Sequence, residues 1–283
     1  MDPCQECKCP VPRSATVCPH CGRPSRYPNV LDASQAEEVD ALLQRYTDAS
    51  TSASALTNFE RQELEDQLRR THVVISRPRG IVEQIATRDN VVYTTFYKLL
   101  DSGMQLPQDD EWDRARMAAD VLLFCHFHRE IRFGALSVDG TGLPNYGEFF
   151  LELRDDFIAH RTSVLEENVV TLLDRLDVKP FRKGVQVPPG HRAPWNERHQ
   201  VGVSKLAGRL RPGMSTADIA QLVIKPGTDS ATDEFIEAHV FGSITRRTLA
   251  QVTLADNGKR EEVELPGKML YSKECAKASK ESV

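Results

Sequence analysis

Residues 235–241 alternate between two kinds of side chain with the period of two that is typical of a β-strand. One face of the expected strand carries three apolar residues suited to a core: Ile236, Ala238 and Val240. The other face carries an acid and an imidazole among aromatic rings: Phe235, Glu237, His239 and Phe241. A plain edge strand has such polar residues for solubility, whereas an active-site strand uses desolvation to shift their pKa values.

Apolar residues at helical spacing predict three helices before residue 130. The stretch "SQAEEVDALLQRY" has Ser34 as its expected N-cap, and the stretch "NFERQELEDQLRR" is a second, highly charged helix. The clearest helix is "QLPQDDEWDRARMAADVLLFCHF". The expected apolar face of the first helix is Val39, Leu42, Leu43 and Tyr46, and that of the third is Trp112, Met117, Val121, Leu122 and Cys125. We therefore expect Cys125 to be a core residue.

The pattern changes after residue 130, where several strands are expected. The strand candidates are "HVVIS" earlier in the chain, then "IRFGALSV" and "YGEFFLEL". The stretch "FIAHRTSVLEENVVTLLDRL" should begin extended and end as a helix. Two further helices, "NERHQVGVSKLAGRL" and "STADIAQLVI", are expected, the second capped by Ser215, and "TRRTLAQVTLADNGKREEVEL" predicts a short helix and a pair of strands.

Four of the seven cysteines have the spacing of a zinc site. Each of two C-x2-C turns would present two thiolates to one tetrahedral ion, and ten residues separate the turns. The four expected ligands are Cys4, Cys7, Cys18 and Cys21. Cys9 and His20 are spare ligands, either of which could replace one of the four. The alternative to a zinc site is that these four cysteines form two disulfides in a secreted protein.

These patterns predict an α+β protein with four segments. Residues 1–24 form a zinc ribbon, residues 25–75 a linker and helical arm, residues 76–270 an α+β catalytic domain, and residues 271–283 a polar tail. The two helices of the arm would form a hairpin that joins the ribbon to the main domain.

Composition excludes some classes of protein. The formal net charge of −5 argues against a chain built wholly around nucleic acid. No apolar run approaches the roughly 20 residues that span a bilayer, and "MDPCQECKCP" lacks the layout of a signal peptide. We therefore expect a cytoplasmic protein that does not enter the membrane.

Three stretches after residue 130 resemble the ADP-ribosyltransferase fold. They are "IRFG", "YGEFFLELRDDFIAHRTS" and "FIEAHVFGSI". The likeness is to the divergent versions in bacterial polymorphic toxins and phage-conflict proteins, and it covers roughly residues 130–255. In that family an early strand carries an Arg or His, a middle segment has a Tyr-Gly strand and then Arg with a small hydroxyl residue, and a late strand carries the acid. The resemblance implies a split, strongly curved β-structure with a cleft for NAD⁺.

The resemblance assigns a role to each matching residue. Glu237 would be the catalytic carboxylate, which stabilises an oxocarbenium-like ribosyl cation and helps to activate the nucleophile, with His239 as an assisting or replacing group. Ser163, or Thr162, would be the small hydroxyl that orders the acid and the ribose. Tyr146 would stack on nicotinamide. Arg132 would contact the phosphates or the ribose, and His128 and Arg161 are the alternatives for this cation.

One departure affects the chemistry of the acceptor. The family often has an acid or Gln two residues before the catalytic acid, where it helps to select arginine-type acceptors, and this chain has Phe235 there. The acceptor therefore stays open: a protein, a nucleic acid, a small molecule or water.

Two other functions remain open on the sequence. In the first, the protein is a non-catalytic zinc-ribbon module that binds nucleic acid or protein through the cations and Trp195 of "KPFRKGVQVPPGHRAPW". The same segment can also be interpreted as a solvated loop or as a flap over the cleft. In the second, His126 and His128 hold a catalytic metal together with Glu130 or Asp139.

Overall fold

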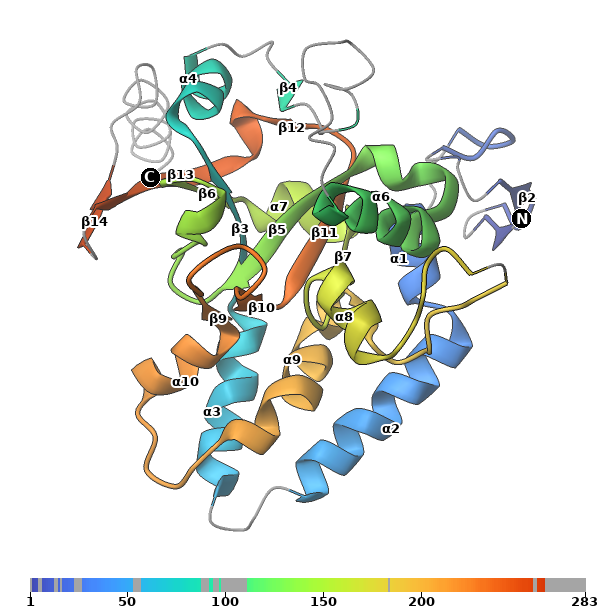
Figure 1. Ribbon diagram of the computed structural model, residues 1–283. Coiled ribbons are helices and arrows are strands. Elements are labelled where there is room, and N and C mark those ends of the chain that lie inside the picture. The colour runs from blue at the N-terminus through green and yellow to red at the C-terminus, as the bar shows by residue number, and fades with distance from the viewer. Residues whose placement is uncertain are drawn as a thin grey trace, which may run out of the picture.

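An antiparallel sheet forms the centre of the computed structural model (Figure 1). Its strand order within the described residues is β14-β13-β6-β3-β5-β11-β7-β8. The strands are β3 (His72–Arg77), β5 (Ile131–Ser137), β6 (Phe149–Leu153), β7 (Thr162–Leu165), β8 (Arg192–Pro194), β11 (Glu237–Phe241), β13 (Leu249–Asp256) and β14 (Lys259–Glu262). The structure describes residues 2–4, 7–12, 15, 17–22, 27–52, 57–87, 92–93, 97, 111–182, 184–256 and 259–262.

Short strand pairs and helices surround this sheet. The pairs are β1 (Asp2–Pro3) with β2 (Pro10–Val11), β4 (Val92–Tyr93) with β12 (Ile244–Thr245), and β9 (Ile224–Lys225) with β10 (Glu234–Phe235). The α-helices are α1 (Pro28–Ala33), α2 (Ala36–Ser52), α3 (Asn58–Arg69), α4 (Arg79–Thr87), α6 (Glu111–Phe124), α7 (Asp155–Ile158), α8 (Val169–Arg175), α9 (Arg198–Leu206) and α10 (Thr216–Val223). The expected mixture of helix and sheet, with a cysteine cluster near the N-terminus, is confirmed.

The two faces of the sheet pack against different helices. Ala238 and Val240 of β11 belong to the larger core, to which α2, α3, α9 and α10 contribute their buried apolar residues. Phe241 belongs to a second core, on the face that carries Glu237, together with residues of α6 and α8. The expected division of the 235–241 strand into two faces is therefore confirmed, although residue 236 separates β10 from β11.

The expected helical arm lies in the larger core. Leu64 and Leu68 of α3 are fully buried there, and α3 and α2 both pack on α9. Ser34 is not the N-cap of α2, because a separate helix α1 begins at Pro28 and Ser34 is its C-cap. Proline at the first helical position favours this earlier start. Of the expected apolar face of α2, Leu42 is buried, whereas Val39 and Leu43 are exposed.

Helix α6 buries a different face from the one that hydrophobicity indicated. Met117 and Val121 are exposed, whereas Ala119, Asp120 and Leu123 are buried. The expectation that Cys125 is a core residue is wrong, because α6 ends at Phe124 and Cys125 is exposed with a positive φ of 48°. The side chain of Trp112 lies outside the described residues.

Most elements after residue 130 match the expected ones. Ser215 caps α10 in a reciprocal capping box with Asp218, as predicted from "STAD". The start of "FIAHRTSVLEEN" is helical instead of extended, since α7 and a 3₁₀ turn (Ala159–Arg161) precede β7. Expectations for residues 88–91, 94–96, 98–110 and 263–283 lie outside the described residues.

Candidate active site and candidate metal centre

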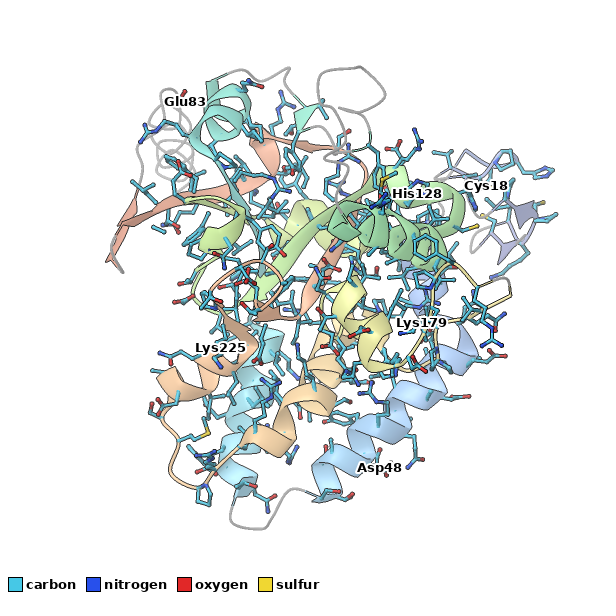
Figure 2. The ribbon with its side chains drawn as sticks, viewed as in Figure 1. Cys18, Asp48, Glu83, His128, Lys179 and Lys225 are labelled. Carbon is cyan, nitrogen blue, oxygen red and sulfur yellow. The ribbon has the colours of Figure 1, made fainter. Side chains whose placement is uncertain are left out.

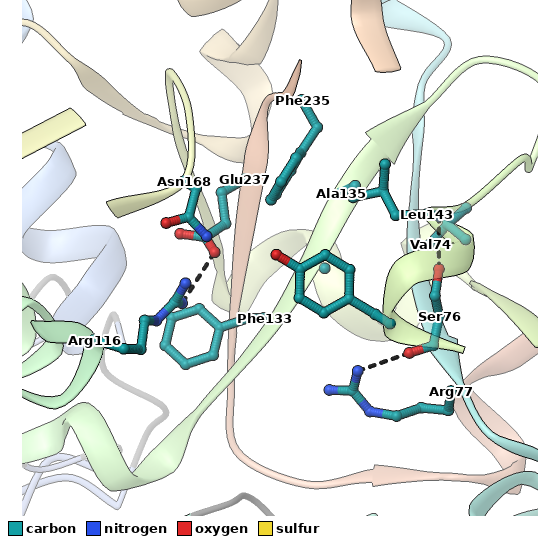
Figure 3. A pocket seen from close by; sticks show the side chains of 12 residues that line it. Val74, Ser76, Arg77, Arg116, Phe133, Ala135, Leu143, Asn168, Phe235 and Glu237 are labelled. Carbon is teal, nitrogen blue, oxygen red and sulfur yellow. Dashed lines mark hydrogen bonds and ion pairs between the residues drawn. The ribbon is translucent and has the colours of Figure 1, made fainter. Parts of the chain in front are cut away.

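A pocket lies on the face of the sheet that carries Glu237 (Figure 3). Its volume is about 320 Å³, at the lower end of the ~300–1,000 Å³ of typical ligand sites. The wall is formed by strand residues and by residues of neighbouring loops and helices: Val74, Ser76, Arg77, Arg116, Phe133, Gly134, Ala135, Leu143, Tyr146, Asn168, Phe235 and Glu237. The pocket therefore combines apolar and aromatic walls with three charged groups.

The carboxylate of Glu237 accepts hydrogen bonds from three donors. Oε1 lies 3.0 Å from Nη2 of Arg116, and Oε2 lies 3.1 Å from Nε2 of His239 and 3.3 Å from the backbone nitrogen of Val169. Burial alone would raise the pKa of Glu237, but the Arg116 cation and the His239 hydrogen bond hold this pKa below its usual range. The acid is therefore ionised at neutral pH, and Nε2 of His239 carries the proton of their hydrogen bond.

Arg116 is held by a second acid and by an aromatic ring. Its Nε donates to Oδ1 of Asp120 at 3.1 Å, and its guanidinium lies 4.2 Å from the centre of the Phe133 ring. Tyr97 donates to the other oxygen of Asp120 at 2.7 Å. Burial favours the neutral form of Arg116, but the two carboxylates of Asp120 and Glu237 raise its pKa above the usual value. Arg116 is therefore a charged bridge between these two acids.

Tyr146 and Arg77 form the opposite side of the pocket. Gly147 has φ of 139°, and a Cβ at this position would overlap the backbone of Arg77 and Pro78. The Tyr-Gly sequence is thus needed for the close approach that brings Tyr146 to the end of β3. Arg77 donates to the hydroxyl of Tyr93 and to the carbonyl of Ser76. Burial, with the nearby Glu237 charge, raises the pKa of Tyr146 to about 12, so its hydroxyl is protonated.

His239 and Ser163 lie beneath the pocket wall on neighbouring strands. The register pairs His239 with Ser163 of β7 and with Phe133 of β5, whereas Glu237 pairs with Leu165 and Ala135. Ser163 is therefore next to the imidazole instead of the acid. Its hydroxyl accepts a hydrogen bond from Nδ2 of Asn29 at 3.2 Å.

Three other candidate residues have their side chains elsewhere. Arg132 pairs with Val240 in the sheet, so it points away from the face of Glu237, and it donates to the carbonyl of Glu130 at 2.8 Å. Thr162 is also on that far face and donates to the carbonyl of Ile158 at 2.7 Å. Arg161 donates to three backbone carbonyls, those of Phe157, Phe241 and Ser243. The expected meeting of Arg132 with Glu237 in one pocket is therefore absent from the structure.

Arg77, Arg116, Phe133 and Asn168 are among the pocket residues that the sequence patterns did not assign to a site. A signal for Arg116 was present, because Arg116, Ala119, Asp120 and Leu123 recur at helical spacing and share one face of α6. Asn168 is the N-cap of α8 and accepts from the backbone of Val170 at 3.0 Å, so a cap signal could have located it. Arg77 ends the expected "HVVIS" strand, but nothing in the sequence shows that this strand, β3, lies beside β5 and so two strands away from β11.

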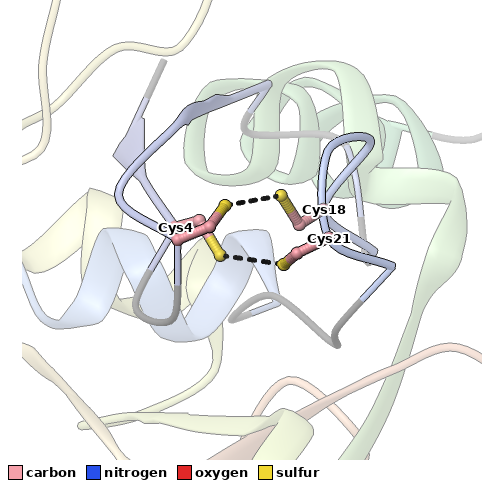
Figure 4. A group of neighbouring side chains, drawn as sticks. Cys4, Cys18 and Cys21 are labelled. Atoms are coloured by element: carbon pink, nitrogen blue, oxygen red, sulfur yellow. Dashed lines mark hydrogen bonds between the residues drawn. The ribbon is translucent and has the colours of Figure 1, made fainter.

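The four expected zinc ligands lie together (Figure 4). Their sulfur atoms are all within 4.8 Å of one another, with Cys4 3.7 Å from Cys21 and Cys7 3.6 Å from Cys18. A tetrahedral Zn²⁺ with bonds of ~2.3 Å separates its sulfur ligands by about 3.8 Å, so the cluster fits this ion. Within the part of the chain that the structure describes, no other group of three or more metal-binding side chains meets, so neither Cys9 nor the two histidines at 126 and 128 form one.

Both cysteine turns close in the same way. The backbone nitrogen of Lys8 donates to the carbonyl of Cys4 at 2.9 Å, and that of Gly22 donates to Cys18 at 2.9 Å. Lys8 and Gly22 both have positive φ, at 60° and 67°. The repeated turn indicates a structural site in which four thiolates fill the coordination sphere and leave no open position for substrate.

Within the described part of residues 179–195, two of the cations are paired with acidic neighbours. Lys179, on the outside of the molecule in Figure 2, lies 3.1 Å from Asp177, and Arg192 lies 2.6 Å from Glu38. Trp195 is only 4 % exposed and packs under Arg198. This ring is therefore not available to stack on a nucleic-acid base.

Comparison with known protein families found no matching family, and comparison with curated proteins found no match. Among the described helices, none has both the length and the apolar character that crossing a bilayer requires.

Proposed function

We propose that the pocket binds NAD⁺ and that the protein transfers ADP-ribose to an acceptor or to water. One observation carries this proposal: the pocket has the Glu237 carboxylate, paired with Arg116, on one side and the Arg77 cation on the other (Figure 3). NAD⁺ has the matching polarity, since its nicotinamide ring is cationic and its pyrophosphate is anionic. The order of the "IRFG", "YGEFFLEL" and "FIEAHVFGSI" stretches, with its likeness to ADP-ribosyltransferases, supports the same ligand.

The proposed reaction breaks the bond between the nicotinamide nitrogen and C1′ of the ribose. The electron pair of that bond leaves with nicotinamide, and C1′ becomes an oxocarbenium-like cation. The Glu237 carboxylate stabilises this cation, because a fixed negative charge in a desolvated site interacts strongly with developing positive charge. The acceptor or a water molecule then bonds to C1′ and loses a proton.

The other pocket residues have supporting roles in this proposal. Tyr146 lines the pocket and offers a ring for stacking on nicotinamide. Arg77 takes the place that the resemblance gave to Arg132 and binds phosphate oxygens. His239 orients Glu237 through its 3.1 Å hydrogen bond. The fold proposed is a divergent member of the ADP-ribosyltransferase type, with the zinc ribbon as a cap or targeting module.

Release of nicotinamide from NAD⁺ tests this function. We expect Glu237→Gln to lower the rate at least about 100-fold, because it keeps the shape of the side chain and removes the charge. Glu234→Gln is the matched control, because this acid precedes the pocket strand and pairs with Arg209 at the surface, so its rate should stay within about twofold.

Two results would contradict the proposal. The first is equal release by the wild type and Glu237→Gln. The second is no release by folded, zinc-loaded wild type supplied with proteins and nucleic acid as acceptors, which would favour a non-catalytic binding module.

A further inference from the structure

The acid of the pocket is nearly saturated with donors. A carboxylate has about four lone-pair positions, and Arg116, His239 and Val169 occupy three of them on Glu237. The Glu237 side chain is only 2 % exposed. A ligand that is to reach this carboxylate closely must therefore displace one of the three donors.

Arg116 is the donor that a ligand can displace. His239 is two residues away on the same strand and 2 % exposed, and Val169 donates from its backbone, so both are fixed by the fold. Arg116 is on a long side chain from a different element, α6, and its side chain is 20 % exposed. It is also the only one of the three that lines the pocket.

Arg116 has other partners that would keep it in place after such a displacement. Its Nε remains bonded to Asp120, and the Phe133 ring remains beneath its guanidinium. Rotation of the outer nitrogen away from Glu237 therefore leaves the cation paired. The guanidinium plane offers its donors as a fork that matches two phosphate oxygens.

A second cation faces the same space. Arg77 lines the pocket and donates to the hydroxyl of Tyr93 and to a carbonyl. Within the residues that the structure describes, it has no carboxylate at ion-pair distance. An anion in the pocket would thus meet Arg77 directly and could draw Arg116 toward it.

We propose that Arg116 is a ligand-responsive switch: a phosphate-bearing ligand takes the outer nitrogen of Arg116 from Glu237 and so frees one carboxylate oxygen for the substrate. The ligand-free site is then held closed by the Arg116–Glu237 ion pair. This inference rests on the proposed function for the identity of the natural ligand, NAD⁺, whereas the competition for Arg116 concerns any phosphate.

Binding of inorganic pyrophosphate to the zinc-loaded, full-length protein tests the competition by calorimetry. Because Glu237 and pyrophosphate compete for Arg116, Glu237→Gln should tighten pyrophosphate binding by roughly 5- to 150-fold, the usual range of coupling between sites. Arg116→Gln and Arg77→Gln should each weaken it.

A double-mutant cycle separates the switch from simple loss of negative charge. In the Arg116→Gln background, the gain from Glu237→Gln should disappear if it acts through Arg116. A gain of the same size in that background would overturn the switch, as would unchanged or weaker binding by Glu237→Gln. Arg211→Gln, in the surface hollow between α9 and α10, controls for binding of pyrophosphate outside the pocket. If Arg211→Gln abolished pyrophosphate binding and Arg116→Gln did not, the proposed switch would also be overturned.

Turnover of nicotinamide riboside, which has the same glycosidic bond and no phosphate, provides a second test. The wild type should cleave it slowly, and added pyrophosphate should accelerate the cleavage; no acceleration in a protein that cleaves NAD⁺ would overturn the switch. Failure to cleave either substrate would overturn the proposed function instead, and the calorimetric cycle would still decide the switch.

Discussion

At the scale of single residues, Glu166 is a buried acid outside the pocket that contacts three basic side chains. Its oxygens lie 2.7 Å from Nδ1 of His191, 2.7 Å from Arg45 and 3.0 Å from Arg175. Arg45 belongs to α2, Arg175 to α8, and His191 directly precedes β8, so one carboxylate joins three parts of the chain. Burial would raise the pKa of Glu166, but the hydrogen bonds of His191 and Arg45 lower it to about 2.

This depressed pKa predicts how stability depends on pH. An acid with a lower pKa in the folded state stabilises the protein above its unfolded pKa and loses this contribution as pH falls through the folded value. For Glu166 the loss runs from about pH 4.5 to about pH 2 and amounts to about 3 kcal/mol. Urea unfolding at several pH values should show that the free energy of unfolding falls less on acidification in Glu166→Gln than in the wild type. The exposed control Asp156→Asn should lose as much as the wild type. Parallel curves for wild type and Glu166→Gln would contradict the assignment.

At the scale of elements, helix α1 fastens two strands of the pocket face. The buried side chain of Asn29 donates from Nδ2 to the carbonyls of Arg161 and His239 and to the Ser163 hydroxyl. Two residues earlier, the Tyr27 ring lies 5.4 Å from that of Phe241. The helix therefore fixes β7 against β11 beside the imidazole of His239.

Removal of this amide should destabilise the protein. Asn29→Ala leaves buried acceptors without their donor, so we expect the free energy of unfolding to fall by about 2 kcal/mol. Urea denaturation checks this value, with Gln44→Ala on the exposed side of α2 changing it by less than about 0.5 kcal/mol. An equal effect of the two substitutions would show that Asn29 does not fasten the strands.

Among the elements, the sequence predicts the buried face of one strand but not that of one helix. The two faces of the 235–241 stretch were predictable because its side chains alternate with a period of two, and the face that enters the larger core is wholly apolar. The buried face of α6 was not, because Arg116 and Asp120 turn inward as an ion pair, so hydrophobicity pointed to the exposed Met117 and Val121. Burial of paired charges removes the signal on which amphipathic patterns depend.

The pocket itself was only partly predictable. Glu237 and Tyr146 were recognised and both line it, because each belongs to a short stretch with its own local pattern. Arg77 was missed in favour of Arg132, since the choice depends on register and on the order β3-β5-β11 in the sheet. Pairings between residues more than 60 positions apart, as in β3 with β5 and β5 with β11, leave no local trace in one sequence.

At the scale of the whole molecule, the expected zinc ribbon around the cysteine cluster has its own small core. Its buried residues are Cys4, Val11 and Cys18, packed with Cys7 and Ala15, and none comes from the sheet. We expect a chelator to remove about one Zn²⁺ per chain and to unfold the ribbon, because such small domains are folded by their metal. The main thermal transition of the sheet should remain.

Metal analysis with calorimetry checks this expectation. Cys18→Ser should lose the zinc, whereas Cys9→Ser should keep it, because Cys9 is outside the sulfur cluster. Loss of the sheet transition together with the metal would show that the ribbon and the sheet unfold as one unit.

The position of β11 between β5 and β7 has a consequence during synthesis of the chain. β5 ends at Ser137 and β11 begins at Glu237, so about 100 residues, or ~5–20 s of translation, separate the two. Until β11 emerges, β5 and β7 each present an open edge, and such edges invite pairing with other chains. The strand that carries the acid also joins the two parts of the sheet. An unfinished chain therefore lacks the acid of the pocket and is at the same time the form most in need of a chaperone.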